Sequence, residues 1–484
     1  MTANMVRSAI HICAILAFYL ATAMLIPGLV DLYYENADWR VFAVSSAGIG
    51  CLSALIAIAT RSPEPPVVST RFTFLLVNLL WLTFCLCATV PLYLSELELS
   101  FVDAFFEGVS GAKATGSTVL TGLDVMPPGI LLWRSMLQWF GGLGVIVLAI
   151  FILPILRVGG SNFFKIESSD RYERPFARFS TYGYTIFGVY TALTVLCAIA
   201  YTWAGMSAFD GINHAMTTLS TGGLSTHDRS FGFFNQNIHM VAIIFMIIGA
   251  LPFPVIILFA LKGRFEAFRD NQVFVFLGYT LFLAVLVAIY LRLTGVFVGS
   301  DAFINSLFNI TSIITTTGYS NSDYMEWGPF ALGAFLLATV LGGCAGSTSG
   351  GIKAYRWTIL FGSIKRALEI FIYPNAVRQV RTGSVPINEQ LQYVTLMYFS
   401  TFLLLWFIGT LVIAATGEDL VTAFSSALTA LANVGPALGD KVGPADNFAG
   451  LNTAAKYVMA FGMLLGRLEL FSMLVLFSPS FWRE

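Results

Sequence analysis

The chain has 484 residues, of which 57% are hydrophobic and only 11% are charged, and its formal net charge at pH 7 is −1. Charged residues make up about 25% of an ordinary soluble domain, so the composition indicates a protein that crosses the membrane many times. The nearly balanced charge gives no electrostatic reason to expect nucleic acid as a partner.

Ten segments are long and apolar enough to be predicted as membrane spans. A hydrocarbon core requires about 20 consecutive apolar residues in a helix. The segments with this length and character are 9–30, 41–60, 72–95, 131–156, 181–205, 238–261, 273–298, 329–360, 391–415 and 453–477. The first is too long for a signal peptide and has no cleavage-type sequence after it, so it is predicted to be a true span.

Basic residues lie between alternate spans, and this asymmetry predicts the orientation. They include Arg7, Arg61, Arg71, Arg157, Lys165, Lys262, Arg269, Lys365 and Arg366. The opposite loops carry acidic residues such as Asp31, Glu96 and Asp301. Because positive charge is retained on the cytoplasmic side, both termini are predicted to be cytoplasmic.

Four short semi-apolar segments recur between spans, at 104–116, 210–222, 306–318 and 423–435. Thirteen helical residues extend only about 20 Å, so each segment is too short to cross and is predicted to enter the membrane and return. The predicted fold is therefore an all-α polytopic membrane protein with four span, re-entrant helix and span repeats around a pseudo-fourfold pore, preceded by two extra transmembrane helices. The predicted units are an N-terminal two-helix domain at 1–70 and pore repeats at 71–158, 159–264, 265–382 and 383–484.

Each re-entrant segment ends in residues suited to binding a cation. The carboxyl end of a helix carries about half a negative charge, and the glycine that follows can adopt backbone angles that other residues avoid. Successive carbonyl oxygens can then replace the hydration shell of an ion. The predicted filter residues are Ala114, Thr115, Gly116, Ser220, Thr221, Gly222, Thr316, Thr317, Gly318, Asn433, Val434 and Gly435.

An acidic residue follows each of these glycines, namely Asp124, Asp228, Asp323 and Asp440. Together they would form an outer mouth that concentrates cations and repels anions. The alternative is that they are ordinary solvated loop residues.

The predicted span 329–360 is broken by glycines and small hydroxyl residues: Gly342, Gly343, Gly346, Ser347, Thr348, Ser349, Gly350 and Gly351, followed by Lys353. Each interior glycine costs a helix about 1 kcal/mol relative to alanine. Unwound backbone at membrane depth persists only where protein buries it or where it lines a water-filled cavity, and such breaks mark ion or substrate routes. A glycine-rich cytoplasmic turn is the alternative.

These features together resemble the TrkH family, the pore subunits of bacterial Trk potassium uptake systems, in a superfamily with KtrB and the plant HKT transporters. The resemblance covers essentially the whole chain and includes the four loops and the stretches 138–144, 220–228, 342–353 and 466–469. It implies potassium as the transported ion, because glycine stands at the key position of all four loops. It also implies that 342–351 is a gating loop, that Arg467 projects into the pore, and that the protein is an inner-membrane homodimer regulated by a cytosolic, nucleotide-binding TrkA-like ring.

Two residues of the first loop depart from the family pattern, since Lys113 and Ala114 stand where threonines are usual. Aligned by the predicted glycines, the counterparts of Lys113 are Leu219, Thr315 and Ala432. An ammonium group in the conduction path would oppose cation permeation strongly. Alternatively, it lies behind the filter, paired with a carboxylate such as that of Glu107 or reaching water.

The sequence leaves a second kind of transporter open, in which potassium or sodium is coupled to sodium or protons through alternating access. Four similar repeats favour a continuous pore over this alternative. No catalytic arrangement and no GxxxxGK[ST] motif is present, so the chain is predicted not to be an enzyme and to rely on another chain for nucleotide binding. Arg134 is expected to bind a carboxylate of the mouth, and His227 to be a solvated residue or a sensor of external pH.

Overall fold

The computed structural model describes residues 3–62, 69–148, 179–263, 268–375, 379–383, 385–467 and 470–482. Within these ranges the protein is almost entirely α-helical. The strands found there are β1 (Arg381–Thr382) and β2 (Val385–Pro386), which pair antiparallel. The predicted unit boundaries after 158 and after 264, and the predicted basic residues Arg157 and Lys165, fall outside the described residues.

Seven helical stretches in the described part are long and apolar enough to cross a membrane. They are α1 (Ala3–Ala23) with α2 (Leu25–Tyr33), α3 (Trp39–Thr60), α4 (Thr70–Leu94), α6 (Pro128–Val147), α9 (Phe179–Trp203), α13 (Asn271–Leu293) and α17 (Glu389–Ala414). Two bent pairs raise the number to nine, namely α11 (Gln236–Ala250) with α12 (Phe253–Lys262) and α19 (Thr453–Arg467) with α20 (Leu470–Leu474) and the turn after it. The described chain ends with α21 (Pro479–Trp482). The molecule is therefore an all-helical membrane protein.

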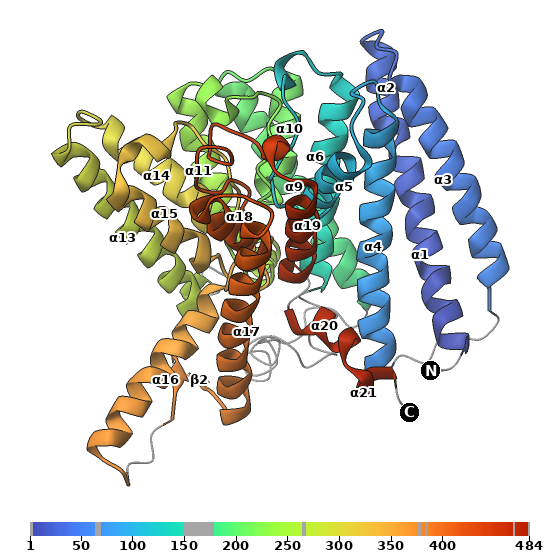
Figure 1. The fold of residues 1–484 in the computed structure, drawn as a ribbon. Helices are drawn as coiled ribbons and strands as arrows, with labels where there is room; N and C mark the ends of the chain where they lie inside the picture. The colour runs from blue at the N-terminus through green and yellow to red at the C-terminus, as the bar shows by residue number, and fades with distance from the viewer. Residues whose placement is uncertain are drawn as a thin grey trace.

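The predicted span 329–360 is interrupted, as its glycines indicated. It consists of α15 (Pro329–Leu341), a non-helical segment, and α16 (Ala354–Ile372). In Figure 1, α16 extends beyond the other helices at the end of the molecule that also holds both chain termini.

The predicted span 238–261 is sharply bent, because α11 and α12 meet at an angle of 102°. Pro252 lies at the break, and proline cannot donate the backbone hydrogen bond that a continuous helix needs. The exposed backbone groups find partners in the interrupted segment instead. The amide of Phe253 donates to the carbonyl oxygen of Gly346 at 2.9 Å, and the carbonyl oxygen of Ala250 accepts from the amide of Cys344 at 3.0 Å.

Four short helices stand between the spans, namely α5 (Phe101–Ala112), α10 (Ala208–Leu219), α14 (Asp301–Ile314) and α18 (Leu420–Ala432). They contain 12 to 14 residues, which is about 20 Å and too little to cross a hydrocarbon core. Three begin at a side-chain cap, since Ser100, Ser207 and Asp419 each accept a hydrogen bond from a backbone amide in the first turn. The fixed starting points determine where each helix ends inside the protein.

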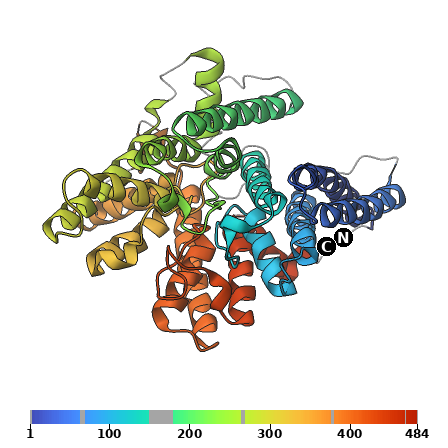
Figure 2. The same ribbon diagram turned by 90° about the horizontal axis from the view of Figure 1, so that it is seen from above.

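The helices of the four predicted repeats surround a common centre when the molecule is seen from above (Figure 2). The N-terminal helices α1 to α3, in blue, lie to one side of this arrangement. They are attached partly through Asp31 of α2, whose buried carboxylate accepts a hydrogen bond of 2.6 Å from the amide of Gly129 in α6. The N-terminal helices therefore cover one flank without contributing to the centre.

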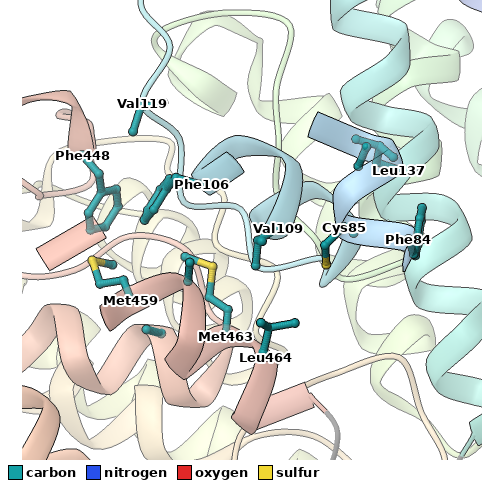
Figure 3. Close-up of a cluster of buried hydrophobic side chains, with 14 of the residues drawn as sticks. Phe84, Cys85, Phe106, Val109, Val119, Leu137, Phe448, Met459, Met463 and Leu464 are labelled. Carbon is teal, nitrogen blue, oxygen red and sulfur yellow. The ribbon is translucent and has the colours of Figure 1, made fainter. Parts of the chain in front are cut away.

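Helix α5 is held on several sides by apolar side chains. Figure 3 shows Phe106 and Val109 of α5 among residues of α4, α6 and α19, including Phe84, Leu137 and Met463. Lipid offers little hydrophobic driving force for helix association, so close van der Waals packing has to hold such helices together. Gly108 and Gly111 permit it, because any side chain there would press on Thr89 of α4 and Leu137 of α6.

Candidate functional site

The four short helices end in the same unusual backbone conformation. Within two residues of the end of each helix, one residue other than glycine has a positive φ, namely Ala114 (50°), Thr221 (49°), Thr316 (57°) and Asn433 (54°). Two residues later a glycine also has a positive φ, namely Gly116 (93°), Gly223 (77°), Gly318 (86°) and Gly435 (116°). Positive φ is uncommon in residues other than glycine, so its recurrence at matching positions shows that the four loops are built alike.

This conformation corrects the predicted register of the second loop by one residue. The glycine that corresponds to Gly116 is Gly223, whereas Gly222 corresponds to Thr115. The counterpart of Lys113 is accordingly Ser220 rather than Leu219. Two glycines stand side by side in this loop, and the backbone angle identifies Gly223 as the one that corresponds to Gly116.

The four loops contact one another in a closed ring. Each glycine of positive φ lies against the backbone of the next loop: Gly116 against the carbonyl oxygen of Gly222, Gly223 against that of Thr317, Gly318 against that of Val434, and Gly435 against that of Thr115. A side chain at any of the first three would collide with the neighbouring oxygen. The junction between the fourth and first loops also has hydrogen bonds, from Ser117 Oγ to the Gly435 oxygen at 2.8 Å and from Asn433 Nδ2 to Thr115 Oγ1 at 2.9 Å. The predicted filter residues are thus brought together and nearly all are buried.

Gln138 of α6 supports this ring, although the sequence analysis assigned it no role. Its Nε2 donates to the carbonyl oxygen of Gly222 at 2.6 Å, and its Oε1 accepts from the amide of Leu224 at 3.1 Å. Both contacts lie in a fully buried environment. A polar amide inside an apolar span is the signal that would have indicated such a role.

The predicted gate segment lies against the ends of three short helices. Thr348 Oγ1 lies 3.0 Å from the carbonyl oxygen of Leu219 in α10 and 2.9 Å from that of Gly249 in α11, so its one proton is shared between these two acceptors. The amide of Gly350 donates to Thr316 Oγ1 at 2.6 Å, and that of Gly351 donates to the carbonyl oxygen of Ala432 at 2.8 Å. The segment 342–351 is buried except for Ala345 and Gly351, which are partly exposed, and this burial excludes an exposed cytoplasmic turn.

Hydrogen bonds within the segment keep its irregular shape. Ser347 Oγ donates to the carbonyl oxygen of Cys344 at 2.6 Å, and the amide of Ala354 donates to that of Gly343 at 2.9 Å. Lys353, whose φ is +71°, donates from its ammonium group to the carbonyl oxygen of Ser349. The backbone groups that the broken helix leaves free are therefore satisfied by this segment and its neighbours.

Lys113 points away from the ring and into the protein behind the first loop. Its Nζ lies 3.8 Å from the ring centroid of Trp81 in α4, and the residue is fully buried. Glu107, its expected partner, instead binds Arg134 at 2.8 Å. The cation is therefore stabilised by an aromatic face rather than by a carboxylate.

Arg134 binds a carboxylate, as expected, but not one of the predicted mouth. Its partner Glu107 lies on α5, and both side chains are almost fully buried.

Arg467 lies at the end of α19 beneath the fourth loop. The preceding Gly466 lies against the carbonyl oxygen of Leu431, and Arg467 itself is only 4% exposed. Its guanidinium nitrogens have no hydrogen-bond partner among the described residues.

The four predicted mouth aspartates lie in two groups. Asp228 accepts from the amides of Gly122 and Leu123 at 3.0 and 3.1 Å, which ties the second loop to the first. Asp124 contacts His227 Nδ1 at 2.5 Å, and this hydrogen bond holds the pKa of Asp124 below its usual value. Asp323 and Asp440 instead lie near Asp446, whose pKa is raised first by burial and further by the negative charges of these two aspartates.

Membrane spans, short helices that end inside the protein and a buried ring of four loops define a polytopic membrane protein of the ion-transport class. The family model of TrkH, described as a cation transport protein, matches residues 42–298 and 280–484. The chain therefore belongs to the TrkH family, as its motifs indicated, and is a transport protein rather than an enzyme.

Individual relatives match the chain over nearly its full length. The Trk system potassium uptake protein TrkI of Halomonas elongata is 38% identical, covering 98% of this chain and 96% of that protein. The Trk system potassium uptake protein TrkH of Salmonella typhimurium is 37% identical, covering 99% of each. The crystal structure of the potassium transporter TrkH from Vibrio parahaemolyticus superimposes with a TM-score of 0.91 at 33% identity, covering 99% of both chains.

Proposed function

We propose that this protein takes up potassium through a passage formed where the four loops meet. The observation that carries the proposal is the closed ring of contacts between the glycines of positive φ and the carbonyl groups of the neighbouring loops. Its relatives from Halomonas elongata and Salmonella typhimurium are potassium uptake proteins. In this proposal the four repeats surround a pseudo-fourfold axis, and the two N-terminal spans lie outside it.

The selectivity filter in this proposal consists of backbone oxygens. Carbonyl groups that face a common axis replace the hydration shell of a monovalent cation. The second loop contributes Thr221, Gly222 and Gly223 in the corrected register. The other three loops contribute the predicted residues 114–116, 316–318 and 433–435.

The segment 342–351 and Arg467 form the gate in this proposal. The segment contacts the carboxyl ends of α10, α14 and α18, and an ion leaving the ring toward the cytoplasm has to pass it. The buried guanidinium of Arg467 adds an electrostatic barrier to cations, because water and salt screen a buried charge only weakly. Displacement of both groups would open the passage.

The outer aspartates serve in this proposal as a source of negative potential for arriving cations. Asp228 and Asp440 are exposed, and their charges lie on different loops around the mouth.

The oligomeric state, the orientation and the partner in this proposal are inferred from the family and from the positions of basic residues. We propose a homodimer in the bacterial inner membrane, with both termini cytoplasmic and a TrkA-like nucleotide-binding ring on that side. Both termini lie at one end of the molecule, together with the projecting end of α16, which carries Lys365 and Arg366 (Figure 1). Cytoplasmic loops retain such basic residues.

Rubidium uptake into liposomes that contain the purified protein tests the proposal. We expect uptake that excess potassium abolishes and that the same concentration of sodium leaves almost unchanged. Empty liposomes provide the background. Folded protein that takes up no rubidium, or uptake that sodium and potassium suppress equally, would overturn the proposed function.

A further inference from the structure

Each of the four short helices carries a polar residue at the same distance from its loop. Glu107, His214, Asn309 and Ser426 each stand nine residues before the glycine of positive φ in their own repeat. Their side chains differ in size, charge and hydrogen-bonding groups, although the backbone around them is the same. Because the position is shared and the side chains differ, the hydrogen bonds that each residue makes to its own loop can be compared.

The contacts identify this task in the first and third loops. The amide of Val119 donates to Glu107 Oε2 at 3.0 Å, and the amide of Asn321 donates to Asn309 Oδ1 at 3.4 Å. Val119 and Asn321 are each the third residue after the loop glycine. Each short helix therefore holds the strand that returns from its own loop.

The fourth loop uses the neighbouring serine for the same bond. The amide of Leu438, again the third residue after its glycine, donates to Ser425 Oγ at 3.0 Å, and Ser425 Oγ lies 2.6 Å from the carbonyl oxygen of Leu438. The hydroxyl of Ser426 has no hydrogen-bond partner in the described part of the chain. Position 425 thus replaces position 426 in this repeat.

The second loop has a variant of the arrangement. His214 Nε2 lies 2.9 Å from Ser225 Oγ, and Ser225 Oγ accepts from the amide of His227 at 3.1 Å. The link therefore reaches the backbone of the return strand through one additional hydroxyl group.

The first loop alone uses a charged residue, and its counter-ion joins two loops. Arg134 Nε binds Glu107 Oε1 at 2.8 Å, while the other guanidinium nitrogens donate to Thr118 Oγ1 and to the carbonyl oxygen of Ser225, both at 3.1 Å. Ser225 belongs to the return strand of the second loop. A buried ion pair with its remaining hydrogen bonds satisfied holds its partners firmly.

We propose that Glu107, His214, Asn309 and Ser425 are positioning residues that fix the return strands and thereby set the preference of the passage for potassium over sodium. The inference rests on the proposed function. A backbone amide that loses its acceptor becomes an unpaired polar group, which costs free energy, so the return strand must shift to give it another partner. A shift of the return strand changes the spacing of the carbonyl oxygens just before it, and that spacing decides which ion fits.

The adjacent serines of α18 allow a matched test. Ser425→Ala removes the acceptor for Leu438, whereas Ser426→Ala removes a hydroxyl that is equally buried but unbonded. We expect Ser425→Ala to lower the ratio of rubidium to sodium uptake about fivefold, the effect of losing one ordinary hydrogen bond. Ser426→Ala should keep the parent ratio, and Ser425→Thr should restore it. Equal ratios for the two alanine variants would overturn the inference.

The third loop repeats the comparison where Ser425→Ala does not fold. Asn309→Ala removes the acceptor for Asn321, and Thr311→Val removes a buried hydroxyl of α14 that has no partner among the residues described. The melting temperature of each variant measures structural damage separately, since damage alone lowers stability without changing the ion ratio. A parent protein without rubidium uptake would reject the proposed function, whereas a selective parent with unchanged variants would reject only this inference.

Discussion

At Gly223 the requirements of backbone angle and space coincide, because φ is +77° and any side chain would collide with the carbonyl oxygen of Thr317. We expect Gly223→Ala to abolish selective rubidium uptake, because the second and third loops can no longer meet. Gly295→Ala is the matched control, since Gly295 has a φ of +75° and open space around it. That change should cost about 1 kcal/mol of stability from backbone strain and leave uptake intact. Uptake that both variants retain, measured in the same liposomes, would remove the structural basis for the closed ring.

The effect of the positive charge of Arg467 on cation flux can be tested by a single substitution. Arg467 is only 4% exposed, and its guanidinium group has no hydrogen-bond partner among the described residues that would offset its positive charge. At an effective dielectric constant near 20, two unit charges about 8 Å apart repel by about 2 kcal/mol. We therefore expect Arg467→Ala, which removes such a repulsion for a passing cation, to increase rubidium flux by roughly thirtyfold.

Arg467→Lys provides the control for this charge effect, because it retains the positive charge and alters only the hydrogen-bonding head. Its flux should remain near that of the parent protein. A folded Arg467→Ala protein with unchanged or lower flux would argue against the gate.

At the scale of elements, hydrogen bonds hold the proposed gate segment to the neighbouring helices, and Thr348 makes several of them. Its Oγ1 lies within hydrogen-bond distance of the carbonyl oxygens of Leu219 and Gly249, which share its one proton, and it accepts from Thr221 Oγ1 at 3.3 Å. Thr348→Val preserves the shape of the side chain and removes these bonds. We expect it to raise basal rubidium flux severalfold, because each bond contributes about 1 kcal/mol to the closed arrangement.

Thr339→Val is the corresponding change in α15, where the hydroxyl donates only to the carbonyl oxygen of Phe335 one turn earlier. It should leave basal flux unchanged. If the two variants behave alike in flux measurements, Thr348 has no special part in closure.

The outer ends of the first two loops are joined by a cluster that depends on pH. The ring of His227 stacks on that of Phe233, with 3.8 Å between the ring centroids. Its two nitrogens face Asp124 and, at 3.5 Å, Asp210. The adjacent residue, Asp228, accepts a hydrogen bond from the first loop. Burial lowers the pKa of His227, but the bonds to Asp210 and Asp124 outweigh this and raise it above the ordinary value. The cluster is therefore strongest when His227 is protonated.

The sign of the pH effect follows from this raised pKa. The stabilisation is complete below the ordinary histidine pKa of about 6.5 and is lost as pH rises through the higher folded value. The lowered pKa of Asp124 has the opposite sign and matters only in acid, where its protonation removes the bond.

We expect the difference in melting temperature between the parent and His227→Gln to be largest near pH 6 and to vanish at alkaline pH. His11→Gln changes a histidine that bonds only the backbone and Thr60, so it should show no such trend. A pH-independent difference for His227→Gln would exclude the cluster as a pH-dependent link.

The sequence was informative where a feature repeats or costs energy in lipid. The four short helices were predictable because their length cannot span a membrane, and the break at 342–351 because glycines weaken a helix. The register of the second loop was not, since Gly222 and Gly223 differ only in backbone angle. The pairing of Glu107 with Arg134 depends on neighbours that are distant in sequence, and no local pattern specifies it. The bend at Pro252 has a local signal, since proline interrupts a helix, but the sequence does not specify its angle.

At the scale of the whole molecule, the proposed function combines a nearly fourfold ring of loops with an asymmetric gate. Within the described residues, the long non-helical interruption of a span lies in the third repeat, between α15 and α16, and this segment contacts the ends of three other helices. In the proposal this one segment moves, whereas Gln138, Ser117 and the ion pair of Arg134 hold the ring in place.

This division favours a continuous gated passage over alternating access. A carrier that rocks two halves about a central site would have to break the contacts that close the ring on each cycle, including the bonds between the first and fourth loops. A gated passage needs only the displacement of 342–351. Transport should therefore follow the potassium gradient without a second driving ion.

The reversal potential of current through the reconstituted protein distinguishes the two mechanisms. We expect it to shift by about 59 mV for each tenfold change in the potassium ratio, the value for one monovalent ion moving alone. Changing the proton or sodium gradient at a fixed potassium gradient should leave the potential in place. The Thr348→Val protein serves as an internal check, because an open gate should increase the current and keep the same reversal potential. A potential that moves with the proton or sodium gradient would show coupled transport, and the ring would then have to open and close during each cycle.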